Sequence, residues 1–244
     1  MITSLENEKV KYFKKLQMKK YRDEEGLYLV EGKHLVEEAL KEGCLEEVIT
    51  TEEDSLFLPN VLVSKEVMRT LSTTDNPPTI MGVCKKKEEE IVLGEKILYL
   101  DEIQDPGNLG TLIRSATAFG IDTILLSKNT VDIYNPKVLR STQGLHFHIS
   151  FQVKDFEEVY AFLKENEYKI YGTNVEEGVD VRSLKRKEVQ KFCLVLGNEG
   201  KGVKKEIQEV CDKNLYIPMS ENAESLNVGV AGSILLYELE RIYE

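Results

Sequence analysis

The sequence predicts a two-part α/β protein, in which an open parallel sheet with helices on both faces is preceded by a smaller α/β unit. From about residue 91 onward, short apolar runs alternate with helical patterns, which is typical of strands joined by crossover helices. Before that point, a shorter α/β pattern ends near Asn76-Pro77-Pro78. Between the two patterns, Lys85–Glu90 is a charge run without periodicity. We therefore expect a linker there, and domains of residues 1–90 and 91–244.

The expected elements of the first domain follow from apolar spacing and from residues that begin or end helices. Val10, Phe13 and Leu16 recur at helical spacing, Gly43 follows the second helix, and Ser64 can cap the third. In order, the pattern predicts a helix over Lys9–Tyr21, a strand over Leu27–Val30, a helix over Gly32–Leu40, strands over Val48–Thr51 and Val61–Val63, and a helix from Ser64 to Leu71.

The second domain begins with a strand, a loop, a helix and another strand. Its first helix is expected to have Asn108 as its N-cap and to end at Gly120. Such a unit predicts a parallel sheet, because parallel neighbours need a crossover connection. The predicted strands are Ile97–Leu100, Asp122–Leu126, His148–Val153, Tyr168–Thr173, Phe192–Leu196 and Asn214–Ile217. The predicted helices are Asn108–Phe119, Pro136–Gln143, Phe156–Lys164, Val203–Val210 and Ser225–Tyr243.

Composition restricts the class of protein. The four cysteines are scattered without CxxC spacing, which argues against a zinc site and a disulfide framework and fits a reducing cytoplasm. His146 and His148 are expected to alternate on a strand and to face the same side, but two ligands do not make a metal site. The first residues lack an apolar signal segment, and the run Val228–Tyr237 is far shorter than the ~20 residues that span a bilayer. We expect a cytoplasmic protein without metal or membrane contact.

Charge is distributed unevenly along the chain. The net charge is −11, yet residues 1–22 contain seven lysine and arginine residues against two glutamates, a net charge of +5. An acidic protein does not coat nucleic acid, but one basic segment can bind a polyanion locally. The alternative is an amphipathic helix whose basic face is merely solvated.

Three loops carry unusual residues, and ligands of open α/β sheets bind beyond the carboxyl ends of the strands. Asp101–Arg114 (DEIQDPGNLGTLIR) leads into a helix whose free N–H groups favour an anion. Leu194–Val203 (LVLGNEGKGV) contains three glycines but has neither dinucleotide-binding nor P-loop spacing. The missing GxGxxG disfavours an oxidoreductase.

The third loop runs into a helix with an unusual number of small residues. Ile217–Glu238 (IPMSENAESLNVGVAGSILLYE) includes Gly229, Ala231, Gly232 and Ser233 where an ordinary helix has larger apolar residues. A glycine inside a helix costs about 1 kcal/mol relative to alanine. We therefore expect a helix, a subunit or a ligand to approach this backbone closely.

Together the loops resemble the three signature motifs of the SpoU (TrmH-type) RNA 2′-O-ribose methyltransferases of the SPOUT superfamily. The matching segments are NxGxxxR after the first strand, GNEGxG after a late strand, and IPM…ESLNVGVAGSILLYE at the C-terminus. The preceding domain, with its EGKHLVEEAL segment, resembles an L30e-like substrate-binding domain. The resemblance implies an S-adenosylmethionine pocket in a C-terminal trefoil knot, a homodimer through the knot region, and methylation of one nucleotide in RNA, foremost 23S ribosomal RNA.

The resemblance also implies roles for individual residues. The cofactor-binding candidates are Thr173, Gly197, Asn198, Ile217, Met219 and Leu226. The catalytic candidates are Asn108, Arg114, Glu199, Ser225 and Asn227, with Arg114 matching the residue proposed to activate the 2′-hydroxyl. An arginine stays protonated in proteins and is a poor general base, so a charge clamp beside the developing alkoxide suits it better.

The N-terminal domain is expected to select the RNA, with basic side chains on phosphates. The candidates are Lys11, Lys14, Lys15, Lys19, Lys20 and Arg22. Two alternatives stay open at this point: a tRNA substrate for the same activity, and a catalytically silent RNA-binding or ribosome-assembly protein. The presence of all five catalytic candidates argues against the silent protein.

Overall fold

The structure is a computed structural model that describes residues 1–53, 59–87, 93–174 and 178–244. The chain forms two compact units. Unit 1 comprises Met1–Glu88 and Asp132–Phe147, and unit 2 comprises Glu89–Val131 and His148–Glu244. The expected domain boundary after residue 90 lies outside the described residues. Unit 1 is thus built from two separate stretches of the sequence, because Asp132–Phe147 lies between two segments of unit 2.

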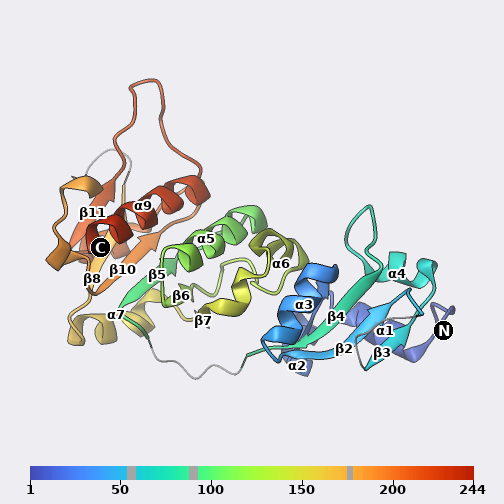
Figure 1. Ribbon diagram of the computed structural model, residues 1–244. Coiled ribbons are helices and arrows are strands. Elements are labelled where there is room, and N and C mark those ends of the chain that lie inside the picture. Colours follow the sequence, from blue (N-terminus) through green and yellow to red (C-terminus); the bar gives the residue numbers. More distant parts are fainter. Residues whose placement is uncertain (54–58, 88–92, 175–177) are drawn as a thin grey trace. The chain divides into compact units, whose positions relative to one another are not determined.

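Unit 1 contains a mixed sheet of four strands within the described residues, in the order β1-β4-β2-β3 (Figure 1). Its elements are α1 (Glu8–Lys15), α2 (Lys19–Glu25), β1 (Leu27–Glu31), α3 (Lys33–Lys41), β2 (Leu45–Thr50), β3 (Asn60–Leu62), α4 (Lys65–Leu71), β4 (Ile80–Lys85) and α6 (Pro136–Thr142), followed by the 3-10 turn η1 (Leu145–His148). Separate cores form on the two faces of the sheet: α1 and α4 cover one, and α3 and α6 cover the other.

The sequence prediction missed β4, although β4 pairs with both β1 and β2. The apolar run is short, follows two prolines and contains Gly82, which weakens the strand signal. Gly82 is nevertheless required here, because a Cβ at this position would lie 2.8 Å from Cδ1 of Leu45. Lys85 ends this strand, so the charge run that we assigned to a linker begins within the sheet.

The single helix predicted over Lys9–Tyr21 is wrong, because the chain breaks between α1 and α2. Nη1 of Arg22 donates hydrogen bonds to the carbonyl oxygens of Leu16 (3.0 Å) and Gln17 (2.6 Å), and Nε2 of Gln17 donates to the carbonyl oxygen of Leu71 (2.7 Å). The two bonds from Arg22 satisfy carbonyl oxygens that a continuous helix would have paired internally, and the bond from Gln17 ties the break to the end of α4.

Unit 2 contains a parallel sheet of seven strands within the described residues, in the order β7-β6-β5-β10-β8-β11-β9. Its elements are β5 (Lys96–Leu100), α5 (Pro106–Ala118), β6 (Thr123–Leu126), β7 (Ser150–Val153), α7 (Phe156–Glu165), β8 (Lys169–Thr173), β9 (Val179–Asp180), η2 (Val181–Ser183), η3 (Arg186–Glu188), β10 (Phe192–Leu196), α8 (Lys205–Val210), β11 (Lys213–Tyr216) and α9 (Val228–Tyr243). The predicted open parallel sheet is confirmed.

Helices cover both faces of this sheet, as predicted. Residues of α7 and α8 pack on the face that carries Tyr99 and Val195. Side chains alternate between the faces of a strand, so Leu196 belongs to the other face, where α5 and α9 lie side by side (Figure 1). β9, η2 and η3 were not predicted, because their segments are too short to show periodicity.

Three local predictions in or next to unit 2 are corrected. α5 begins at Pro106, and its N-cap is Asp105 rather than Asn108. α9 begins at Val228, with Asn227 as its N-cap, rather than at Ser225. His146 and His148 lie in the 3-10 turn η1, before β7, and not on a strand.

The small residues of α9 allow close contact with α5 and β10. A Cβ on Gly232 would lie 2.3 Å from Cδ2 of Leu112 and 2.6 Å from Cδ1 of Leu196, and both leucines are fully buried. At the next position along α9, the hydroxyls of Ser233 and Ser115 are hydrogen bonded at 2.6 Å, and the hydroxyl of Ser233 also donates to the carbonyl oxygen of Gly229. The glycine is therefore explained by close helix packing within the chain.

We expect Gly232→Ala to lower the free energy of unfolding of unit 2 by about 1–3 kcal/mol, because overpacking outweighs the gain in helix propensity. Urea unfolding followed by circular dichroism measures this change. Gly200→Ala is the control, because its Cβ would meet only Oδ1 of Asn198, at 3.7 Å. A Gly232→Ala protein as stable as the wild type would contradict the close contact.

Candidate active site

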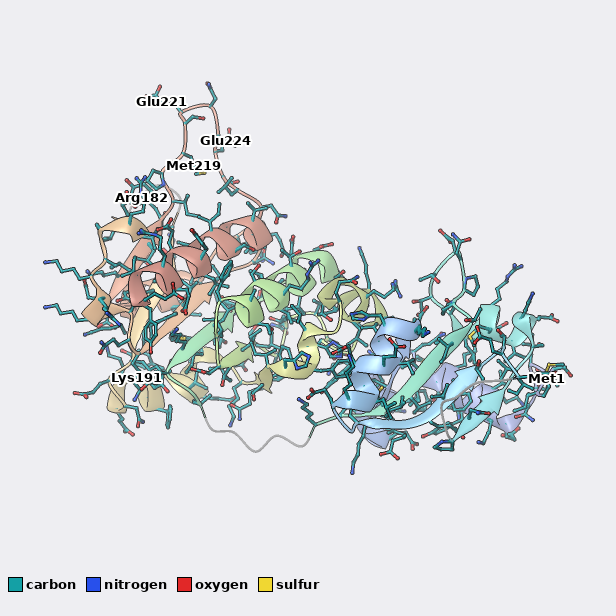
Figure 2. All side chains as sticks on the ribbon, in the orientation of Figure 1. Met1, Arg182, Lys191, Met219, Glu221 and Glu224 are labelled. Atoms are coloured by element: carbon teal, nitrogen blue, oxygen red, sulfur yellow. The ribbon has the colours of Figure 1, made fainter. Side chains whose placement is uncertain are left out.

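A cavity of about 340 Å³ lies at the carboxyl ends of the adjacent strands β10, β8 and β11 of unit 2. The residues that end or follow these strands line it, which is the usual place for a ligand of an open α/β sheet. All six cofactor-binding candidates line this cavity: Thr173, Gly197, Asn198, Ile217, Met219 and Leu226. Figure 2 shows Met219 on the loop between β11 and α9, whose tip carries Glu221 and Glu224 and extends away from the sheet.

The glycine loop, residues 197–204 between β10 and α8, is a tight turn. A Cβ on Gly197 would lie 2.1 Å from both the carbonyl carbon of Gly202 and the amide nitrogen of Val203, so only glycine fits. Oδ1 of Asn198 accepts hydrogen bonds from the amides of Gly200 (3.0 Å) and Lys201 (3.1 Å). The amide of Gly202 donates to the carbonyl oxygen of Asn198. The backbone of the glycine loop therefore forms one wall of the cavity.

Three catalytic candidates form one hydrogen-bonded network. The carboxylate of Glu199 accepts from Nδ2 of Asn108 (3.0 Å) and from the backbone amides of Gln104 (3.1 Å) and Asp105 (2.9 Å). Oδ1 of Asn108 accepts from Nδ2 of Asn227 (2.9 Å), and Oδ1 of Asn227 caps α9. The network joins the loops before α5, after β10 and before α9.

The network sets the charge of Glu199. Partial burial alone would raise the pKa of Glu199, but the hydrogen bonds from Asn108, Asp105 and Gln104 outweigh it, and the pKa lies below its ordinary value. The group is thus a carboxylate near neutral pH. It serves as an acceptor that holds two loops together, and it is a weak candidate for a general base.

The other two catalytic candidates lie apart from this network. Ser225 is exposed and lines the cavity. Arg114 is exposed on α5, does not line the cavity, and forms no hydrogen bond or ion pair with any residue that the structure describes. It lies six residues beyond Asn108, about one and two-thirds turns of helix.

Several lining residues were not singled out from the sequence. They are Asn174, Leu196, Gln208, Leu215, Tyr216, Val228 and Leu235. Most follow or end a strand that was predicted, so the rule of carboxyl ends could have found Asn174 and Tyr216. Gln208 and Leu235 come from helices, and only the packing of those helices brings them to the cavity.

The basic candidates of unit 1 differ in their surroundings. Lys11 pairs with Glu6, Lys19 with Asp23, and Lys20 with Glu24. Lys14 and Lys15 are exposed and form no ion pair with a described residue.

The assignment of Arg22 to RNA binding is wrong. It is 3% exposed, pairs with Asp132 at 2.5 Å, and caps the break between α1 and α2. Its guanidinium is occupied within unit 1, which contradicts its assignment to RNA.

Neither a metal centre nor a membrane span is found in the part of the chain that the structure describes. Among residues 1–53, 59–87, 93–174 and 178–244, no group of three or more histidine, cysteine, aspartate or glutamate side chains could hold a metal ion. No helix within these ranges is long and apolar enough to cross a membrane.

Comparison with known proteins defines the family. Residues 95–237 match the SpoU rRNA Methylase family, and residues 7–82 match the MRM3-like substrate binding domain. The chain belongs to the SpoU rRNA methylase family, as the three loops predicted. As a member, it is an S-adenosylmethionine-dependent RNA methyltransferase, which confirms the predicted enzyme class and cofactor.

Similar proteins cover almost the whole chain. The 23S rRNA (guanosine(2553)-2′-O)-methyltransferase RlmP of Bacillus subtilis (strain 168) is 40% identical, with 98% of each chain covered. The AdoMet-bound rRNA methyltransferase from Sinorhizobium meliloti is 29% identical, covers 98% of this chain and 97% of its own, and has a TM-score of 0.87. AviRb from Streptomyces viridochromogenes, in complex with AdoMet, is 24% identical over 96% of this chain and 97% of its own, with a TM-score of 0.86, and supports the fold alone.

We expect Glu199→Gln to lower the free energy of unfolding by about 1 kcal/mol at pH 7, because the exposed carboxylate loses charge-assisted hydrogen bonds. The pKa of Glu199 is lower in the folded protein than its ordinary value of 4.5. The hydrogen bonds to the carboxylate therefore stabilise the fold fully above pH 4.5, and this stabilisation is lost as the pH falls through the folded pKa. The difference between variant and wild type should therefore shrink in acid. Urea unfolding from pH 7 to pH 3 measures it, with the exposed Glu206→Gln as control. A difference that stays constant with pH would exclude this role for the carboxylate.

Proposed function

We propose that this protein transfers the methyl group of S-adenosylmethionine to the ribose 2′-hydroxyl of one guanosine in 23S ribosomal RNA. The supporting observation is full-length similarity to RlmP, which carries that activity in its name, together with a cavity lined by all six cofactor-binding candidates. We also propose a cytoplasmic location, because that is where bacterial ribosomal RNA is found. Neither the tRNA substrate nor the silent protein is favoured by a specific observation.

The cavity residues fit the cofactor by type. Bound S-adenosylmethionine supplies a methyl group that its sulfonium makes electrophilic. Ile217, Leu226 and Leu235 offer apolar walls, and the backbone around Gly197 and Thr173 offers polar groups at close range. We propose that this backbone holds the adenosine and methionine polar groups and excludes water from the transfer.

We propose that unit 2 forms the knotted domain of the SPOUT fold; the catalytic domain expected over residues 91–244 therefore excludes Asp132–Phe147, which belong to unit 1. Support comes from the strand order, in which β10, β8 and β11 follow β5, and from the return of α9 to pack beside α5 after the loop Ile217–Asn227. Residues 1–90 are proposed as an L30e-like domain that selects RNA, supported by the match of residues 7–82 to a substrate binding domain.

We propose a homodimer in which α5 and α9 form the interface. On the exposed side of α9, Val230, Ile234 and Tyr237 recur at helical spacing, and the rings of Tyr237 and Phe119 lie 5.7 Å apart. An apolar stripe of this kind fits a second copy of the same helix pair across a two-fold axis. Arg114 shares the exposed side of α5, so a dimer can bring it to the partner's cavity.

The function is tested by mapping 2′-O-methyl marks in ribosomal RNA from cells with and without the gene. Loss of one mark in 23S ribosomal RNA, at the position equivalent to guanosine 2553, is the expected result. Restoration of that mark by the purified protein and S-adenosylmethionine completes the test. An unchanged set of ribosomal marks would refute the proposal, and loss of a tRNA mark would favour the alternative substrate.

We expect Arg114→Ala to lower kcat by about 100-fold or more, because the developing alkoxide loses its charge clamp. The dissociation constant for S-adenosylmethionine should not change, since Arg114 does not line the cavity. Single-turnover methylation and calorimetry measure the two quantities, and the exposed Arg186→Ala is the control. Wild-type turnover by Arg114→Ala would remove this residue from the reaction.

We expect Tyr237→Asp to dissociate the dimer, because the interface would have to bury an unpaired carboxylate. Sedimentation velocity measures the change. Phe162→Asp alters another exposed aromatic residue, on α7, and should leave the dimer intact. A stable, active wild-type monomer would overturn the dimer itself.

We expect the double variant Lys14→Ala/Lys15→Ala to weaken RNA binding and to reduce its salt dependence, by about one unit of slope for each phosphate that is no longer neutralised. Lys19→Ala/Lys20→Ala should do less, because these lysines already pair with Asp23 and Glu24. Filter binding at several salt concentrations measures both slopes. Equal slopes for the two double variants would show that Lys14 and Lys15 have no special role.

A further inference from the structure

Glu102 has a backbone conformation that glutamate rarely adopts. Its φ is +59°, in the left-handed region, which costs a residue with a Cβ about 1–2 kcal/mol. It lies two residues beyond the end of β5, in the loop that leads to α5. A strained backbone conformation persists only where the surrounding contacts stabilise it.

Every polar group of Glu102 is engaged. Its amide donates to the hydroxyl of Ser127 (2.8 Å), and its carbonyl oxygen accepts from Nδ2 of Asn198 (2.9 Å). Its carboxylate accepts from Nδ2 of Asn129 (3.1 Å) and pairs with Nζ of Lys204 (2.9 Å). The pair with Lys204 is the main reason that the pKa of Glu102 is lowered.

Two of these partners, Asn198 and Lys204, lie near the two ends of the glycine loop. Asn198 lies near the start of the loop and holds its turn through the amides of Gly200 and Lys201, while Lys204 ends it and also pairs with the buried Asp101 at 3.1 Å. Residues 197–202 line the cavity. One residue therefore fixes both ends of the segment that forms the backbone wall of the cofactor cavity.

We propose that Glu102 is a positioning residue, whose left-handed backbone and carboxylate clasp Asn198 and Lys204 and thereby keep the glycine loop in the shape that receives S-adenosylmethionine. The inference rests on the proposed function and names a residue outside its motifs. Glu102 does not touch the cavity, so it acts through the loop alone.

A matched pair of substitutions separates this role from simple relief of strain. Glu167 is also a glutamate with positive φ (+61°), but it is exposed, lies in the turn before β8, and its side chain makes no bond to a described residue. Glycine removes the strain at both positions. At residue 102 it also removes the carboxylate that holds Lys204, while the backbone carbonyl that accepts from Asn198 remains.

The experiment is titration calorimetry of S-adenosylmethionine with the full-length chain. The stoichiometry reports the folded fraction, and Kd reports the shape of the folded site. We expect Glu102→Gly to raise Kd about tenfold or more, the effect of one charge-assisted hydrogen bond, and Glu167→Gly to leave it unchanged. Wild-type Kd in Glu102→Gly overturns the inference.

Glu102→Gln keeps the size of the side chain and removes its charge. It therefore tests the contact with Lys204 if Glu102→Gly does not fold. We expect it to raise Kd, and the double variant Glu102→Gln/Lys204→Gln to raise it no further than the larger single effect, because both act on one contact. Additive effects, or a wild-type Kd for Glu102→Gln, overturn the clasp. A wild-type protein that binds no S-adenosylmethionine would refute the proposed function instead.

Discussion

One carboxylate holds together three loops that are far apart in the sequence. Glu199, after β10, accepts from the backbone amides of Gln104 and Asp105 before α5, and through Asn108 it reaches Asn227 before α9. The amides of Gln104 and Asp105 lie just before the first turn of α5, where backbone N–H groups lack an acceptor within the helix. A single negative charge at this position satisfies them and gathers the loops beside the cavity.

This use of Glu199 restricts how the 2′-hydroxyl loses its proton. A carboxylate saturated with donors, whose pKa is lowered, has little capacity to take up a proton at neutral pH. Asn108 and Asn227 are amides and cannot act as bases. The chemistry of these groups therefore favours a reaction that depends on alignment, in which water or a phosphate of the RNA accepts the proton.

The sequence predicted the parts of the fold that repeat and missed those that depend on single tertiary contacts. Apolar runs such as Ile97–Leu100 and Phe192–Leu196 show buried strands directly, and the loops after them contain the cavity residues. Asn108 was taken for a helix cap because asparagine is common there, yet Asp105 caps α5, and the amide of Asn108 is used by Glu199. Arg22 looked like a surface cation because its partner Asp132 is 110 residues away. No local pattern contains that information.

The two-part construction of unit 1 bears on how such proteins can be recombined. Leu139 and Phe147, which come from between β6 and β7, belong to the same core as Tyr28 and Val36. A graft of residues 1–90 from one family member onto another would therefore combine core residues from two different parent proteins, and it would also separate Arg22 from its native partner Asp132. A chimaera intended to redirect this methyltransferase to another RNA requires Met1–Glu88 and Asp132–Phe147 from the same parent. The two segments must be exchanged together because they build one hydrophobic core.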